Sequence, residues 1–284
     1  DSGTAAASDI NSIKSVNTDG TITASNITTV TGSATDVITA YSNVNTGFGN
    51  EAISISGTIA VAQARSLNAL TSSTVTGEIV NTSRISEILD TSSGITESGG
   101  SNAYTITIAS ADSAASASDL NSINALTTTL VNLTNVTSLT SSSLTDLGTL
   151  ASAINANEFS NDTGLTTIAL TDTTIDATTL ASTIDSYDTI NGGGTTGMTL
   201  VSGASINVDA GEITEMLADE SLGRLTISDQ VITVTGATTV DNANLLGATT
   251  TGKLTATIAT TETVTELATL SADGGNNDLT IVIR

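Results

Sequence analysis

The sequence contains no cysteine, no histidine, no proline and no tryptophan among its 284 residues. Without cysteine the chain can form no disulfide and offers no thiolate. Without histidine or cysteine it also lacks the residues that build most zinc sites and most nucleophile–base pairs. We therefore predict that the chain is not an enzyme. A secreted protein without disulfides is more typical of a bacterial surface than of an animal one.

Aromatic residues make up 2% of the chain and charged residues 12%, whereas 38% of the residues are hydrophobic. Disordered chains combine low hydrophobicity with high charge, so this composition predicts a folded protein. Because compact cores usually take much of their bulk from aromatic rings, their scarcity favours thin cores filled by aliphatic side chains.

Positive charge is also scarce: the chain has six basic and 29 acidic residues, which gives a net charge of −23. Such a surface repels nucleic-acid phosphates and anionic membranes, and it attracts cations. No apolar run approaches the roughly 18 residues that a bilayer-spanning helix needs. We expect neither a nucleic-acid partner nor membrane insertion.

Aliphatic residues recur three positions apart, as in Ala117, Leu120 and Ile123. This spacing places side chains on one face of a helical turn. Other stretches, such as 105–108 and 231–235, alternate apolar residues with hydroxyl residues and predict strands. A change of period within one short segment indicates a repeated strand–turn unit.

A seven-residue motif supports true repetition. The sequence reads ASDINSI at 7–13 and ASDLNSI at 117–123, which is a separation of 117 − 7 = 110 residues. One strand and one helical turn cannot bury their own apolar face, but stacked copies can. We therefore predict a β-rich repeat solenoid with parallel β-helix-like coils of short strands and short helical turns. Tandem antiparallel β-sandwich domains are the alternative.

Within this scheme, residues 1–6 are a loose N-terminal end and 7–190 form the repeat solenoid. The glycine-rich stretch 191–197 is a wide loop or a boundary. Residues 198–284 continue the solenoid to an uncapped C-terminal strand. The aliphatic residues of the helical turns, with both Ile13 and Ile123 among them, should be buried.

Calcium is the one ligand that the sequence suggests, and we expect no cofactor to be required. Residues 15–26 resemble part of an EF-hand loop, and 274–278 resemble half of a glycine- and aspartate-rich calcium repeat. Both stretches also suit ordinary turns. The candidate calcium ligands are Asn17, Asp19, Asp273, Asn276 and Asp278.

The segments ASDLNSINALTT at 117–128 and ASNITTVTGSATDVITAY at 24–41 resemble the Thr/Ala/Asp-rich repeats of very large bacterial cell-surface proteins, notably those of marine cyanobacteria. The resemblance covers residues 7–60 and 117–150. It implies a secreted structural or adhesive protein and supplies no catalytic residues.

These observations predict an extracellular structural repeat protein of a bacterial cell surface: a rod, filament or surface-coat unit. Copies would assemble head to tail by end-to-end stacking or strand pairing, and cell-surface glycans are a second class of partner. A calcium-dependent adhesin or surface-layer module is the alternative. A polysaccharide-acting β-helix tail spike and an ice-binding protein are weaker candidates. The candidate assembly residues are Leu279, Ile281 and Ile283.

Overall fold

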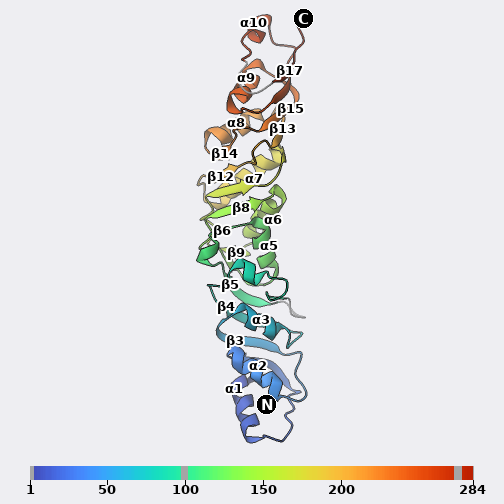
Figure 1. Cartoon of the computed structure of the whole chain (residues 1–284), viewed down its shortest axis with the longest axis vertical. Coiled ribbons are helices and arrows are strands. Elements are labelled where there is room, and N and C mark those ends of the chain that lie inside the picture. The colour runs from blue at the N-terminus through green and yellow to red at the C-terminus, as the bar shows by residue number, and fades with distance from the viewer. Residues whose placement is uncertain (1–2, 97–101, 272–276, 284) are drawn as a thin grey trace. The chain divides into compact units, whose positions relative to one another are not determined.

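The computed structural model describes residues 3–96, 102–271 and 277–283 (Figure 1). It is a mixed α/β fold in which helices alternate with the strands of three parallel sheets, with seven, five and five strands. The chain forms two compact units. The first comprises Asp1–Ser113, Asp119–Val136 and Ala153–Asp162, and the second comprises Ala114–Ser118, Thr137–Ser152 and Thr163–Arg284.

The first unit holds the seven-stranded sheet, whose strands follow one another in chain order. Helices occupy most of the connections between its first strands, so the basic unit is a strand followed by a helix. The strands are β1 (Gly3–Ala6), β2 (Ile27–Gly32), β3 (Ala52–Ile59), β4 (Val75–Ile79), β5 (Ala103–Thr107), β7 (Val131–Asn132) and β9 (Phe159–Ser160). The helices of this part are α1 (Ala7–Val16), α2 (Ala34–Asn43), α3 (Val61–Asn68), α4 (Ile85–Ile88) and the short 3₁₀ helix η1 (Ser110–Asp112).

The second unit holds both five-stranded sheets. One has the order β14-β12-β10-β8-β6 and the other β11-β13-β15-β16-β17. Their strands are β6 (Ala114–Ala115), β8 (Ser138–Ser142), β10 (Thr167–Leu170), β12 (Gly197–Thr199), β14 (Leu225–Thr226), β11 (Thr174–Asp176), β13 (Ser205–Asp209), β15 (Val231–Thr238), β16 (Leu254–Ile258) and β17 (Asp278–Thr280). The helix α5 (Ala117–Ala125) lies mostly in the first unit. The remaining helices are α6 (Leu144–Asn155), α7 (Ala177–Ile190), α8 (Ile213–Ser221), α9 (Val240–Thr249) and α10 (Val264–Leu267).

Side-chain caps define where several helices begin. At the start of α2, the Asp36 amide donates to Ser33 Oγ at 3.1 Å, and this hydroxyl donates to the Asp36 carboxylate at 2.7 Å. Ser143 and Asp146 repeat both bonds at the start of α6, 110 residues later, with the same lengths. Caps of this kind satisfy amides that a helix leaves unpaired at its N-terminus. The repetition therefore extends from the sequence motif to the hydrogen bonds.

The core consists of aliphatic rows that run across neighbouring strands. In the third sheet, Ile206 of β13 is in register with Ile232 of β15, which is in register with Leu254 of β16. All three are buried, whereas the residues directly before and after each of them in the chain are exposed or half-buried. The alternation follows from the two-residue period of a strand.

The predicted β-rich solenoid is wrong, because the structure is a mixed α/β fold with three separate parallel sheets. The three-residue aliphatic spacing continues into regular helices of up to 14 residues, as in α7, and is not limited to single turns. The β-sandwich alternative is also wrong, because every strand pair that the structure describes is parallel. The expected filament was to form by head-to-tail stacking of the ends of a solenoid. It conflicts with an α/β fold whose strands are divided among three parallel sheets.

Individual expectations had mixed outcomes. Residues 3–6, expected to be loose, form β1. In the 191–197 stretch, a turn and an extended segment lead into β12, which begins at Gly197. Ile123 is fully buried as predicted, but Ile13 is 53% exposed. In the part of the chain that the structure covers, no helix has the length and apolarity to cross a bilayer.

Candidate functional site

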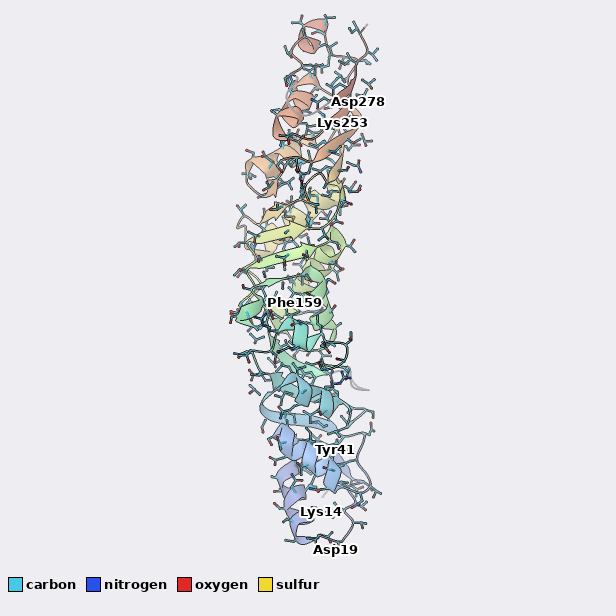
Figure 2. All side chains as sticks on the ribbon, in the orientation of Figure 1. Lys14, Asp19, Tyr41, Phe159, Lys253 and Asp278 are labelled. Atoms are coloured by element: carbon cyan, nitrogen blue, oxygen red, sulfur yellow. The ribbon has the colours of Figure 1, made fainter. Side chains whose placement is uncertain are left out.

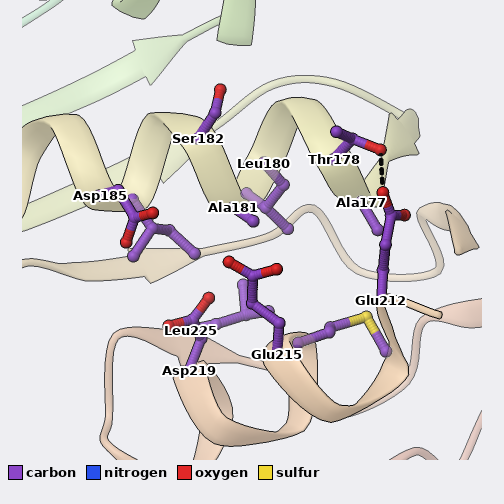
Figure 3. A pocket seen from close by; sticks show the side chains of 12 residues that line it. Ala177, Thr178, Leu180, Ala181, Ser182, Asp185, Glu212, Glu215, Asp219 and Leu225 are labelled. Carbon is purple, nitrogen blue, oxygen red and sulfur yellow. Dashed lines mark hydrogen bonds between the residues drawn. The ribbon is translucent and has the colours of Figure 1, made fainter.

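A small cavity of about 160 Å³ lies between α7 and α8 (Figure 3). Figure 3 shows Glu215 of α8 pointing toward α7, with Asp185 and Asp219 beside it. Glu212 also lines the cavity and accepts a hydrogen bond from the hydroxyl of Thr178 of α7. The apolar part of the lining is formed by Ala177, Leu180, Ala181, Ile184, Met216 and Leu225.

An ionic cluster adjoins this cavity. Arg224 Nε lies 2.7 Å from Asp188 Oδ2, and its Nη1 lies 3.5 Å from Asp219 Oδ1. Both carboxylates are buried, with exposed fractions of 7% and 5%. Burial raises the pKa of Asp219, and the nearby Asp185 and Glu215 carboxylates raise it further; Arg224 opposes them by stabilising the charged form. One guanidinium thus balances two buried acids.

The side chains around this cavity form neither a hydrolytic carboxylate pair nor a metal site. Glu212 and Glu215 are three residues apart and both line the cavity, but the Glu212 carboxylate already accepts from the Thr178 hydroxyl and, at 3.3 Å, from the Asp209 amide. A pair of carboxylates for hydrolysis would need to converge on one bond. Within residues 3–96, 102–271 and 277–283, no three acidic side chains gather in a way that could hold a metal ion. We assign the Arg224 cluster to stability.

The structure brings Asn17 and Asp19 into one turn after α1 (Figure 2 labels Asp19 and Lys14). However, the Lys14 ammonium donates to the carbonyl oxygens of Thr18 and Gly20, at 3.1 and 3.3 Å. Carbonyl oxygens are ligands that calcium also requires. A protein cation therefore already binds the oxygens of this turn, a feature that the sequence analysis missed although Lys14 lies one helical turn before Thr18.

The second group of calcium candidates is only partly visible. Asp273 and Asn276 lie outside the described residues. Asp278 is exposed in β17, where its carboxylate pairs with Lys253 Nζ at 3.1 Å (Figure 2). The Asn277 side chain accepts a bond from the Leu254 amide at 3.2 Å. These contacts join β17 to β16 and hold the last described strand in place.

The predicted assembly residues lie on and after β17. This strand pairs in parallel with β16 over Asp278–Thr280. Leu279 is half-buried, whereas Ile281 and Ile283 are 41% and 70% exposed, with Val282 between them also exposed. In the portion of the chain described, β17 has no strand on its other side. An unpaired strand edge next to exposed aliphatic residues is a ready surface for another strand.

A second open edge lies at β1, which pairs only with β2 among the described strands. Beside it is a groove of about 470 Å³, which we call the β1 groove. It is lined by Thr4, Ala6, Ile10, Ile13, Ile22 and Ile27, with Asp9 at the same surface. Sequence reasoning missed the groove because residues 1–6 show no pattern. The signal that could have indicated it is the second copy of the ASDINSI motif.

No protein-family model, no curated protein and no solved structure matches this chain.

Proposed function

We propose that this chain is a structural protein of a bacterial surface coat, acting outside the cell, and that its copies associate with one another by strand pairing. The observation that carries the proposal is the exposed run of Ile281, Val282 and Ile283 directly after an edge strand, β17. Three neighbouring aliphatic side chains are costly to leave in water, since burying each would contribute about 1.5–3 kcal/mol. A second strand laid along this edge would bury them.

Two further observations support a structural role. The chain lacks histidine and cysteine, and the buried Asp188 and Asp219 are paired with Arg224. Its Thr-, Ser- and Ala-rich repeats resemble those of very large bacterial surface proteins, which implies export and a coat or adhesive role. A net charge of −23 keeps such a surface soluble and repels nonspecific polyanionic partners.

Sedimentation velocity over a range of protein concentrations tests the association. We expect the wild-type chain to form larger species as the concentration rises. Ile281→Asp combined with Ile283→Asp should yield a single species with the mass of one chain. Leu222→Asp is the matched control, because Leu222 is a similarly exposed aliphatic residue (59%) far from β17 in the sequence. A wild-type chain that remains monomeric at every concentration would refute self-association.

The location is tested separately. Antibodies raised against the folded chain should label intact cells of the producing organism before their membranes are permeabilised. Labelling that appears only after permeabilisation would exclude a surface coat.

A further inference from the structure

We infer that the cavity between α7 and α8 binds a short alkyl amine or diamine in its ammonium form. The cavity lies within the second compact unit, and its ligand is independent of the proposed self-association. Three features support this assignment: the counterpart of the cavity in the first unit, a buried carboxylate, and a lining that combines acidic with aliphatic side chains.

The first unit contains a helix pair of the same kind, in which an amide side chain lies where the second pair has its cavity. Asn11 and Ala181 are each the fifth residue of their helix, α1 and α7. Asn11 Nδ2 donates to the backbone carbonyl oxygen of Asp36, the third residue of α2, at 3.1 Å. Glu215 is the third residue of α8, and it lines the cavity together with Ala181. The alanine cannot supply the donor that joins the first pair of helices.

The two helix pairs belong to equivalent segments of the chain. α2 and α8 begin at residues 34 and 213, and β3 and β15, the strands of the main ladders that follow them, begin at 52 and 231. Both separations are 179 residues (213 − 34 = 179; 231 − 52 = 179). Hydrogen bonds repeat at this distance: Thr71 Oγ1 donates to the Glu51 carbonyl oxygen, and Thr250 Oγ1 donates to that of Gln230, both at 2.6 Å. The change from asparagine to alanine is therefore a difference between matching positions.

One carboxylate of the lining is buried without full pairing. Asp219 is 5% exposed, and its Oδ1 lies 3.5 Å from Arg224 Nη1. Within the part of the chain that the structure describes, Oδ2 of Asp219 accepts no hydrogen bond. Burial raises the pKa of Asp219, and the carboxylates of Asp185 and Glu215 raise it further. A cation bound among the three groups would offset both effects.

The lining combines hydrogen-bond acceptors with an aliphatic wall. Figure 3 shows Glu215 directed toward α7, with Asp185 and Asp219 beside it. Neither Asp185 nor Glu215 forms an ion pair with another described residue, and the cavity is lined by no basic side chain of the described chain. The aliphatic wall consists of Leu180, Ile184, Met216 and Leu225. Because an ammonium group is a donor only, the carboxylates suit the charged end of the ligand and the wall suits its alkyl chain.

The volume limits the ligand to a few atoms. The cavity measures about 160 Å³. An apolar cavity of about 150 Å³ holds benzene, so a ligand of about six non-hydrogen atoms matches this space. The diamine with a four-carbon chain, diaminobutane, has this size. A metal ion is a poorer match, because no three candidate ligands for one gather in residues 3–96, 102–271 and 277–283.

Isothermal titration calorimetry with diaminobutane and with n-butylamine tests the site. We expect each amine to bind the wild-type chain at one site. Butanol has the same alkyl chain without the charge, and it should bind about tenfold more weakly or less. Potassium chloride at equal ionic strength is the control for general attraction of cations to a chain with a net charge of −23.

Two substitutions locate the binding. Ala181→Asn restores the side chain that Asn11 supplies in α1, and it should abolish binding by filling the cavity. Glu215→Gln keeps the shape of the side chain but removes its charge, and it should weaken amine binding about tenfold. The matched control is Glu220→Gln, because Glu220 also belongs to α8 but does not line the cavity. Thermal melts followed by circular dichroism show whether each variant is folded.

Three results would overturn the site: butanol that binds as tightly as butylamine, equal weakening by Glu215→Gln and Glu220→Gln, or amine binding that persists in a folded Ala181→Asn chain. Because Glu215 is exposed, Glu215→Gln decides the question even where Ala181→Asn fails to fold. The chain with Ile281→Asp and Ile283→Asp should bind the amine as wild type does. Failure of self-association and failure of the amine site are therefore distinguishable.

Discussion

Arg224 and Asp188 form a close ion pair, with 2.7 Å between Nε and Oδ2, even though they lie 36 residues apart (224 − 188 = 36). Asp188 lies in α7, and Arg224 lies just before β14. The same guanidinium also contacts Asp219 of α8. A single side chain therefore links two helices of the second unit through two carboxylates that water hardly reaches.

Replacing Arg224 with alanine should lower the free energy of unfolding by about 2 kcal/mol, because two buried carboxylates lose their cationic partner. The matched control is Lys253→Ala, which breaks the exposed pair with Asp278 and should cost less than about 1 kcal/mol. Urea unfolding at neutral pH measures both. Equal losses for the two variants would contradict the assigned role of Arg224.

The loss in Arg224→Ala should shrink as the pH falls. Burial raises the folded-state pKa of Asp219, so the folded chain holds this proton more tightly than the unfolded chain. The stability from this group is fully present below the ordinary aspartate pKa of about 4 and declines as the pH rises through the folded value. Arg224 lowers the folded-state pKa of Asp219, so removing the guanidinium raises this pKa further and makes the stability depend more strongly on pH. Urea midpoints of Arg224→Ala that draw away from wild type at acidic pH would refute this assignment.

All three tyrosines should resist ionisation in the folded protein. Burial raises the pKa of Tyr41, Tyr104 and Tyr187, and for Tyr41 the Glu51 carboxylate raises it further. The unfolded chain releases these protons near the ordinary pKa of about 10, so stability falls as the pH rises above that value. Phenolate absorbance should appear together with the loss of circular dichroism. The urea-unfolded chain, the control, should titrate near pH 10; a tyrosine that ionises there while the chain stays folded would contradict the prediction.

Ile123→Ala and Ile13→Ala form a matched pair at one motif position. The first removes a fully buried side chain and should cost about 3 kcal/mol of stability through lost burial and a cavity. The second removes an exposed side chain and should change stability by less than about 0.5 kcal/mol in dilute, monomeric protein. Thermal and urea unfolding measure both. Similar costs would mean that the two copies of the motif are equally covered.

Excess chelator should leave the melting temperature of the chain unchanged, because the Lys14 ammonium already binds the carbonyl oxygens of the turn that carries Asp19. A bound calcium ion would instead stabilise the folded state by mass action, and its removal would lower the melting temperature. A chelator-dependent drop in wild type that disappears in Asp19→Asn would restore this turn as a calcium site.

Some of the structure could be predicted from local sequence alone. The three-residue spacing of Ala117, Leu120 and Ile123 predicted a helical turn, and the structure begins α5 at Ala117. Alternation at 231–235 predicted a strand, which is found within β15. Both signals depend on residues that are neighbours along the chain, because helical and extended backbones each impose their own side-chain period.

Tertiary structure decided what the spacing could not. Near-identical motifs leave Ile13 exposed and Ile123 buried, because burial depends on which distant segment packs against each copy. The division of the strands among three sheets, the contacts of Arg224 with Asp188 and Asp219, and the Lys14 bonds in the Asp19 turn likewise follow from folded geometry. The sequence determined the local elements through short-range sterics and hydrogen bonding. The folded chain determined which of their faces meet a neighbour and which remain open to water.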